Sequence, residues 1–107
     1  MEWILLGLAV VVEVIWALSL KWSTVGGASK FVVAVPIVLS FLNMFLLAQA
    51  MRTIPPGTAY AIWTGLGAAG VAIGSCLIFK QNISITQLAF IALIVVGVAG
   101  TKIFSQA

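Results

Sequence analysis

A single acidic residue, Glu13, interrupts an otherwise uncharged apolar run from Trp3 to Leu20. A membrane-spanning helix needs about 20 mostly apolar residues at 1.5 Å rise each, so this run is long enough to cross a bilayer. The carboxylate would then lie at membrane depth, where an acid costs about 3 kcal/mol and is normally kept for a function inside a helix bundle. The alternative is a buried helix of a soluble protein that contains one paired acid.

The composition favours the membrane protein over the soluble one. The chain has 107 residues, of which 64% are hydrophobic and 7% are charged, whereas soluble domains carry about 25% charged residues. We expect the first apolar run to be a retained helix, because no positively charged segment precedes it. The expected fold is all-α and integral to the membrane, with one domain of four membrane-spanning helices at about 3–20, 31–50, 57–79 and 86–104.

The charged residues predict how the chain is oriented. The basic residues lie near the expected helix ends, at Lys21, Lys30, Arg52, Lys80 and Lys102. The expected topology places Arg52 and Lys102 on the side of both termini and the other three on the opposite side. Because basic residues in short loops set orientation, this near balance predicts insertion both ways and an antiparallel dimer of opposite copies. The basic residues form no stripe, so no nucleic-acid partner is expected.

Glycines mark the third predicted helix. Gly65 and Gly67 lie close together in its middle, where they lower helix propensity and offer a hinge. Gly70 and Gly74 continue a stripe of small residues, for which plain helix packing is the commoner role. The sequence therefore predicts a helix that can approach its neighbours closely and bend.

The second and fourth predicted helices differ in their polar content. Ser40 and Asn43 are three residues apart and can share one face of the second helix. Interhelical hydrogen bonding is at least as common as substrate contact for such residues in membranes. The fourth helix has no central polar residue, so we expect it to contact lipid and a second copy. Ala92 and Gly97 provide its small-residue packing edge.

Four short helices make too thin a bundle to enclose a solute pathway, which favours a dimer. Such a dimer could line one pocket with Glu13 from each copy and with Trp16, Tyr60 and Trp63. Carboxylates and aromatic faces suit an organic cation, since cation-π attraction adds about 2 kcal/mol when the pair is desolvated. Protons and the cation would compete for the same carboxylates, and this competition predicts an exchanger. No nucleophile and base pair, metal cluster or phosphate loop occurs in the sequence, so neither an enzyme activity nor a cofactor is expected.

Three stretches of the sequence resemble the small multidrug resistance transporters. They are Glu13-Val-Ile-Trp16, Pro56-Gly-Thr-Ala-Tyr-Ala-Ile-Trp-Thr-Gly-Leu-Gly-Ala68 and Gly97-Val-Ala-Gly-Thr-Lys102. The resemblance covers essentially the full length of the chain. It implies an antiparallel dimer that exports cations in exchange for protons across a bacterial inner membrane, with Glu13, Tyr60 and Trp63 as shared working residues.

Other positions bear on the substrate. Trp16, Thr64 and Lys102 resemble the guanidinium exporter branch of the family more than the multidrug branch. Val10 and Asn43 depart from that branch, which usually has a small residue and a serine at these places. The alternatives to guanidinium export are export of quaternary ammonium and aromatic cations, a role as one subunit of a heterodimer, and a role as a non-transporting helper of another membrane complex.

Guanidinium presents several hydrogen-bond donors in one plane, so its site should offer carboxylates held by neutral partners. We expect Glu13 of both copies to provide the carboxylates and Asn43, Ser40 and the indoles to support them. The full set predicted to bind protons and substrate is Glu13, Trp16, Ser40, Asn43, Tyr60 and Trp63.

Overall fold

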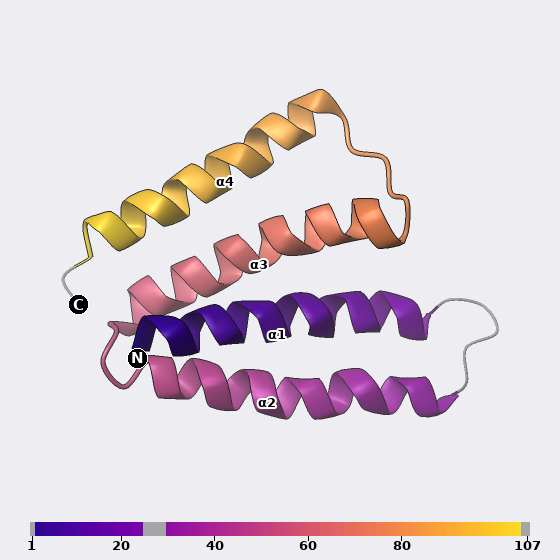
Figure 1. The fold of residues 1–107 in the computed structure, drawn as a ribbon, viewed down its shortest axis with the longest axis horizontal. Helices are drawn as coiled ribbons and strands as arrows, with labels where there is room; N and C mark the ends of the chain where they lie inside the picture. The colour runs from indigo at the N-terminus through magenta and orange to yellow at the C-terminus, as the bar shows by residue number, and fades with distance from the viewer. Residues whose placement is uncertain (1, 25–29, 106–107) are drawn as a thin grey trace.

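The computed structural model describes residues 2–24 and 30–105, and in these ranges the chain forms four long α-helices. The helices are α1 (Glu2–Ser23), α2 (Ala34–Ala50), α3 (Pro56–Ile78) and α4 (Ile85–Ile103), and the 3-10 turn η1 (Lys30–Val33) leads into α2 (Figure 1). The spans have mean hydropathies between 1.7 and 2.5 and are long enough to cross a membrane. The predicted all-helical fold with four apolar helices is therefore confirmed.

Local sequence explains several helix ends. α3 begins at Pro56, and proline suits the first helical turn because the N–H that it lacks has no partner there. α4 is capped by the Ser84 hydroxyl, which accepts a hydrogen bond from a backbone N–H of the first turn at 3.1 Å. Beyond α3, Lys80 adopts a left-handed φ of 55°. This turn lets the backbone N–H of Gln81 donate to the Ser75 carbonyl at 3.2 Å.

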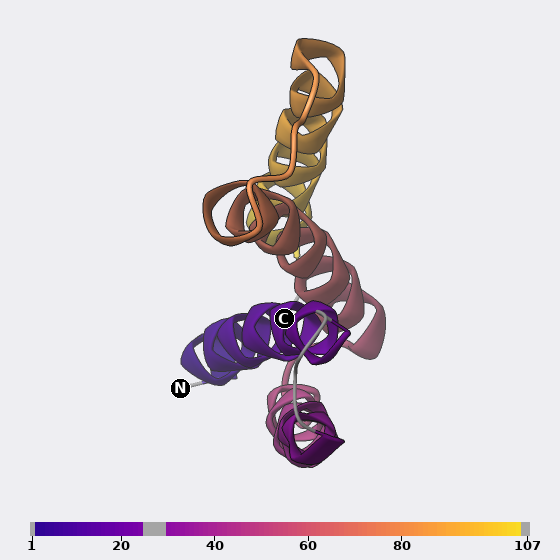
Figure 2. The same ribbon diagram turned by 90° about the vertical axis from the view of Figure 1, so that its right-hand side faces the viewer.

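The helices lie side by side in the order α2, α1, α3, α4, and each runs antiparallel to the next one in sequence (Figure 1). The backbone of α1 packs against both α2 and α3, whereas that of α4 lies beside α3 alone. The Cα atoms extend over 48 × 34 × 17 Å. The chain is thus a slab that is thin in one direction, as Figure 2 shows from the side, and not a closed bundle.

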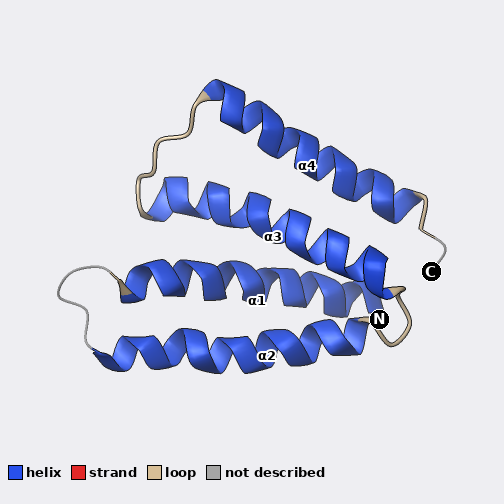
Figure 3. Ribbon diagram, turned by 180° about the vertical axis from the view of Figure 1, so that it is seen from behind, coloured by secondary structure: helices blue, strands red, loops and turns tan. Residues whose placement is uncertain are grey.

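The two ends of this slab are filled differently. One end, which we call the terminal end, contains both described chain ends and the α2–α3 turn at residues 51–55 (Figure 3). The opposite end, the cleft end, contains the end of α1, the start of α2 and the α3–α4 loop at residues 79–84. The buried hydrophobic cluster lies at the terminal end and consists of Leu6, Ala50, Ile54, Ala59 and Ile62.

α4 is the least buried helix, since none of its residues is classed as buried. It approaches α3 closely at Gly65, where an added Cβ would lie 2.6 Å from a methyl carbon of Val98. Toward the loop that joins them the two helices separate (Figure 1). Ala92 and Gly97 are exposed, and a Cβ at Gly97 would meet nothing within 4 Å. Within one chain, the edge predicted for dimer packing is therefore uncovered.

Candidate functional site

Glu13 lies in the middle of α1 and faces α3. A Cβ at Gly67 would overlap the Glu13 carboxylate, so the missing side chain at position 67 makes room for the acid. The Oε2 atom of Glu13 is buried and has no hydrogen-bond partner in the described part of the chain. A buried acceptor without a partner costs free energy. The unpartnered oxygen therefore favours binding of a proton or a cation by Glu13.

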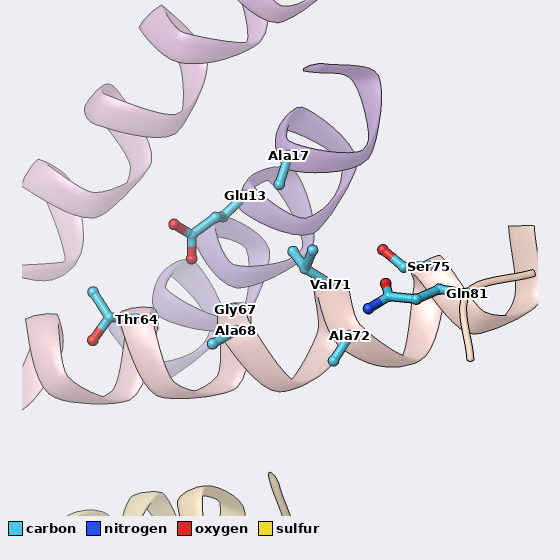
Figure 4. A pocket seen from close by; sticks show the side chains of 9 residues that line it. All are labelled: Glu13, Ala17, Thr64, Gly67, Ala68, Val71, Ala72, Ser75 and Gln81. Atoms are coloured by element: carbon cyan, nitrogen blue, oxygen red, sulfur yellow. The ribbon is translucent and has the colours of Figure 1, made fainter. Parts of the chain in front are cut away.

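An open cleft of about 450 Å³ extends from Glu13 between α1 and α3. Figure 4 shows the carboxylate on the side of Thr64 and Gly67, away from Ser75 and Gln81 at the other end of the lining. Most of the lining consists of small side chains spaced by one helical turn along α3. The lining residues are Glu13, Ala17, Thr64, Gly67, Ala68, Val71, Ala72, Ser75 and Gln81.

Glycines bring α3 close to α1 beyond the acid. A Cβ at Gly70 would lie 2.6 Å from a methyl carbon of Val14, and a Cβ at Gly74 would lie 2.9 Å from one of Leu18. Both distances are shorter than real Cβ contacts, so a side chain at either position requires a shift of the Val14 or Leu18 side chain or of α1. Helix packing, the commoner role predicted for these two glycines, is what the structure shows.

Gly65 and Gly67, the predicted hinge, lie within the uninterrupted α3 helix. Each glycine admits a different neighbour, because Gly65 faces Val98 of α4 and Gly67 faces Glu13 of α1. The two positions therefore serve close packing in this conformation. Bending at this pair remains a prediction about movement.

Four of the predicted site residues surround a second, smaller cavity between α1, α2 and α3. The cavity measures about 230 Å³, and Trp16, Ser40, Asn43 and Trp63 contribute to its lining. The Trp63 Nε1–H donates a hydrogen bond to Asn43 Oδ1 at 3.3 Å, and Asn43 is 5% exposed. The Ser40 hydroxyl donates to the Pro36 carbonyl of its own helix at 2.9 Å.

Within one chain, Asn43 and Ser40 do not support the acid, and their support of Glu13 in a dimer stays a prediction. No hydrogen bond joins either side chain to Glu13 among the bonds of residues 2–24 and 30–105. The physical reason is the rotation of α1, which turns Glu13 toward α3, while α2 presents its polar side chains to the Trp16 side of α1. Within one chain, Asn43 therefore holds Trp63.

Tyr60 lies outside both cavities. Its ring centroid is 5.5 Å from that of Trp63 with an interplanar angle of 42°, and Tyr60 is 54% exposed. The predicted site residues thus form three groups in a single chain, with Glu13 in the cleft, four residues around the second cavity and Tyr60 on the surface beside Trp63.

Ser75 and Gln81 also line the Glu13 cleft, although neither was among the predicted site residues. Helical spacing was the available signal for Ser75, because it lies two turns beyond Gly67 on the same side of α3. Gln81 carried no such signal, since its position depends on the left-handed turn at Lys80.

Comparison with known proteins places this architecture in a family. Residues 1–94 match the Small Multidrug Resistance protein family. Similar relatives include a guanidinium exporter of Yersinia pseudotuberculosis, which is 41% identical over 98% of this chain and 100% of the relative. The guanidinium exporters of Escherichia coli K12 and Salmonella typhimurium are 42% and 43% identical, each over 96% of this chain and 97% of the relative. The chain therefore belongs to the small multidrug resistance family.

Proposed function

We propose that this protein exports guanidinium-type cations in exchange for protons across a bacterial inner membrane. The observation that carries the proposal is the buried Glu13 Oε2, which lacks a hydrogen-bond partner in the described residues and lies at the head of an open cleft. The full-length relatives named guanidinium exporters support the choice of substrate.

One carboxylate can serve both halves of the exchange. When it is ionised, Glu13 accepts hydrogen bonds from a planar guanidinium ion, and charge-assisted bonds of this kind are short and strong. When it is protonated, the same group has lost its charge and the cation leaves. Gly67 leaves room for the carboxylate beside α3, where Glu13 lines the cleft. Proton binding on one side of the membrane and cation binding on the other thus drive each other.

We propose an antiparallel homodimer as the working unit, with a heterodimer as the alternative assembly. A slab only 17 Å thin cannot surround a solute by itself. The uncovered edge of α4 gives a second copy a place to pack. Arg52 and Lys102 belong to the terminal end, and Lys21, Lys30 and Lys80 belong to the cleft end, so the two ends differ by one basic residue.

The antiparallel arrangement is tested by labelling. A single cysteine placed at Lys80 in a Cys76→Ala background should react with impermeant reagents from both faces of the membrane, in roughly equal fractions of the molecules. Labelling from one face only would contradict the antiparallel homodimer and favour a fixed partner subunit.

The substrate is tested by electrogenic transport in proteoliposomes, with guanidinium, methylguanidinium and tetrapropylammonium applied to one preparation. We expect current from guanidinium and none from tetrapropylammonium, because a quaternary ammonium cannot donate hydrogen bonds to the acid. Glu13→Gln protein in matched liposomes supplies the control for leak. Current from tetrapropylammonium with none from guanidinium would replace the proposed substrate with quaternary ammonium compounds.

A further inference from the structure

The Glu13 cleft continues to the cleft end of the molecule. A second hollow of about 420 Å³ reaches Lys21 and Phe79. The two hollows share four lining residues, which are Ala17, Val71, Ser75 and Gln81. They therefore adjoin each other between α1 and α3, and we call the pair the passage. From Gly67 to Ser75 this passage follows α3 for about 12 Å, at 1.5 Å per residue.

Two neutral hydrogen-bonding side chains that line this passage, those of Ser75 and Gln81, make no hydrogen bond within the described residues. Hydroxyl groups within the helices commonly donate to a backbone carbonyl three or four residues earlier, as those of Ser19, Ser40, Thr64 and Thr101 do. No bond of the Ser75 hydroxyl or of the Gln81 side-chain amide occurs among the hydrogen bonds of residues 2–24 and 30–105. Both groups are free to bind something in the passage.

The backbone, and not its own side chain, holds Gln81 in place. Its N–H donates to the Ser75 carbonyl at 3.2 Å, and the Phe79 N–H donates to the same oxygen at 3.0 Å. The left-handed turn at Lys80 makes this return possible. Figure 4 shows the result, in which the Gln81 amide reaches back along α3 beside Ser75.

We infer that Ser75 and Gln81 form an outer binding site for guanidinium-type cations on the way to Glu13, which we call the station. This inference rests on the proposed function. The Ser75 Oγ and the Gln81 side-chain carbonyl are acceptors, and they suit the coplanar N–H donors of guanidinium. A position about 12 Å from a mid-membrane acid lies near the edge of a hydrocarbon layer about 30 Å thick. Here an entering cation loses water, and these acceptors replace part of its hydration.

The station should bind a cation with low affinity, as a site on a transport path requires. Its acceptors are neutral, so they bind a cation less strongly than the Glu13 carboxylate does. Lys21 lines the same hollow and adds a like charge. A site in a conduction path must bind well enough to admit an ion and weakly enough to release it. Because Glu13 binds the cation more strongly than the station does, the cation moves inward to the acid and is not held at the station.

Two replacements of similar size test the role of Gln81 in transport. Gln81→Leu removes the acceptor and should raise the half-saturating guanidinium concentration about threefold to tenfold, the effect of one lost hydrogen bond. Gln81→Glu strengthens the acceptor and should lower that concentration while slowing maximal transport. Gln87→Leu, an exposed position of α4, is the matched control and should change neither. A change of the half-saturating concentration in the same direction in both Gln81 variants would contradict the station. A lowered maximal rate without any change of that concentration would contradict it as well.

Spectroscopy of the side-chain amides tests cation binding at the station independently of transport. In Glu13→Gln protein, guanidinium chloride at tens of millimolar should produce a saturable shift of the Gln81 amide signal that matched sodium chloride does not produce. The signal is assigned by its loss in Gln81→Leu, and Ser75→Ala should weaken the response. A response equal to that of sodium chloride would disprove the station. A saturable shift in a protein that does not transport guanidinium would support cation binding at the station and contradict only the proposed export.

Discussion

The terminal end and the cleft end of this slab are built from the same apolar helices but are filled in opposite ways. At the terminal end, Leu6 and Ile54 are each 2% exposed and Ala50 is fully buried. At the cleft end, α1 and α3 touch through glycine contacts at Gly70 and Gly74 and leave the passage beside them. Large side chains fill one end, and small ones keep the other open.

Close packing and access to the acid are thus assigned to opposite ends of this short chain. Close-packed side chains resist changes of separation, because few voids are left for them to move into. At Gly70 and Gly74 the side chains of α1 pack on the backbone of α3, which contributes no side chain of its own to interlock with them. Glu13 lies in the middle of α1, where the packed end gives way to the open one. Under the proposed function, the terminal end is the fixed part and the cleft end is the part that admits cations.

The largest expected effect comes from Glu13→Gln. The amide keeps the size of the side chain and removes its titration, so proton-coupled guanidinium transport should fall by about 100-fold or more. The thermal unfolding midpoint in detergent should stay within a few degrees of that of the unaltered protein, because the acid contributes nothing to the packed end. Substrate-driven proton movement by the Glu13→Gln protein would show that another group couples the exchange.

Gly67→Ala should act next most strongly. The added methyl group would overlap the Glu13 carboxylate, so the acid or α3 must move. We expect about a tenfold loss of transport, because displacement of a reacting group by about 1 Å can cost that much or more. Gly7→Ala is the matched control, since a Cβ at Gly7 meets nothing within 4 Å. Equal effects of the two variants would show that Gly67 matters for helix propensity and not for the acid.

Much of the fold followed from the sequence because its signals are local. Apolar runs of the required length predicted the four helices, and the isolated Glu13 predicted an acid at mid-helix. Small residues at helical spacing predicted the close packing that Gly70 and Gly74 show. Each of these inferences depends on one helix at a time.

The arrangement of the site could not be predicted in the same way, because it depends on how each helix is rotated against its neighbours. In a single chain α1 turns the acid toward α3 and Asn43 bonds Trp63, so support of Glu13 by Asn43 and Ser40 stays a prediction about the dimer. The position of Gln81 depends on a left-handed lysine that no propensity rule favours. Contacts of Ala92 and Gly97 require a second chain, so a single chain leaves them as predictions.

A smaller effect, on stability alone, is expected from Leu6→Ala at the terminal end. Removing this buried side chain should cost about 2 kcal/mol of unfolding free energy, through lost contacts and a cavity. The half-saturating guanidinium concentration should stay unchanged in the protein that remains folded. Leu77→Ala is the control at the cleft end, because Leu77 is 78% exposed. A change in half-saturation without loss of stability would contradict the division between the two ends.

The smallest expected effect concerns the contact that ties α4 to the terminal end. Lys102 Nζ lies 5.2 Å from the centre of the Trp3 ring, and a cation-π contact of an exposed lysine is worth about 0.5–1 kcal/mol. A double-mutant cycle with Trp3→Leu and Lys102→Gln should give a coupling free energy of about this size. The backbone of α4 lies beside α3 alone. This coupling free energy therefore measures how strongly α4 is attached to the packed terminal end. A coupling near zero would confine the fixed part of the molecule to α1, α2 and α3.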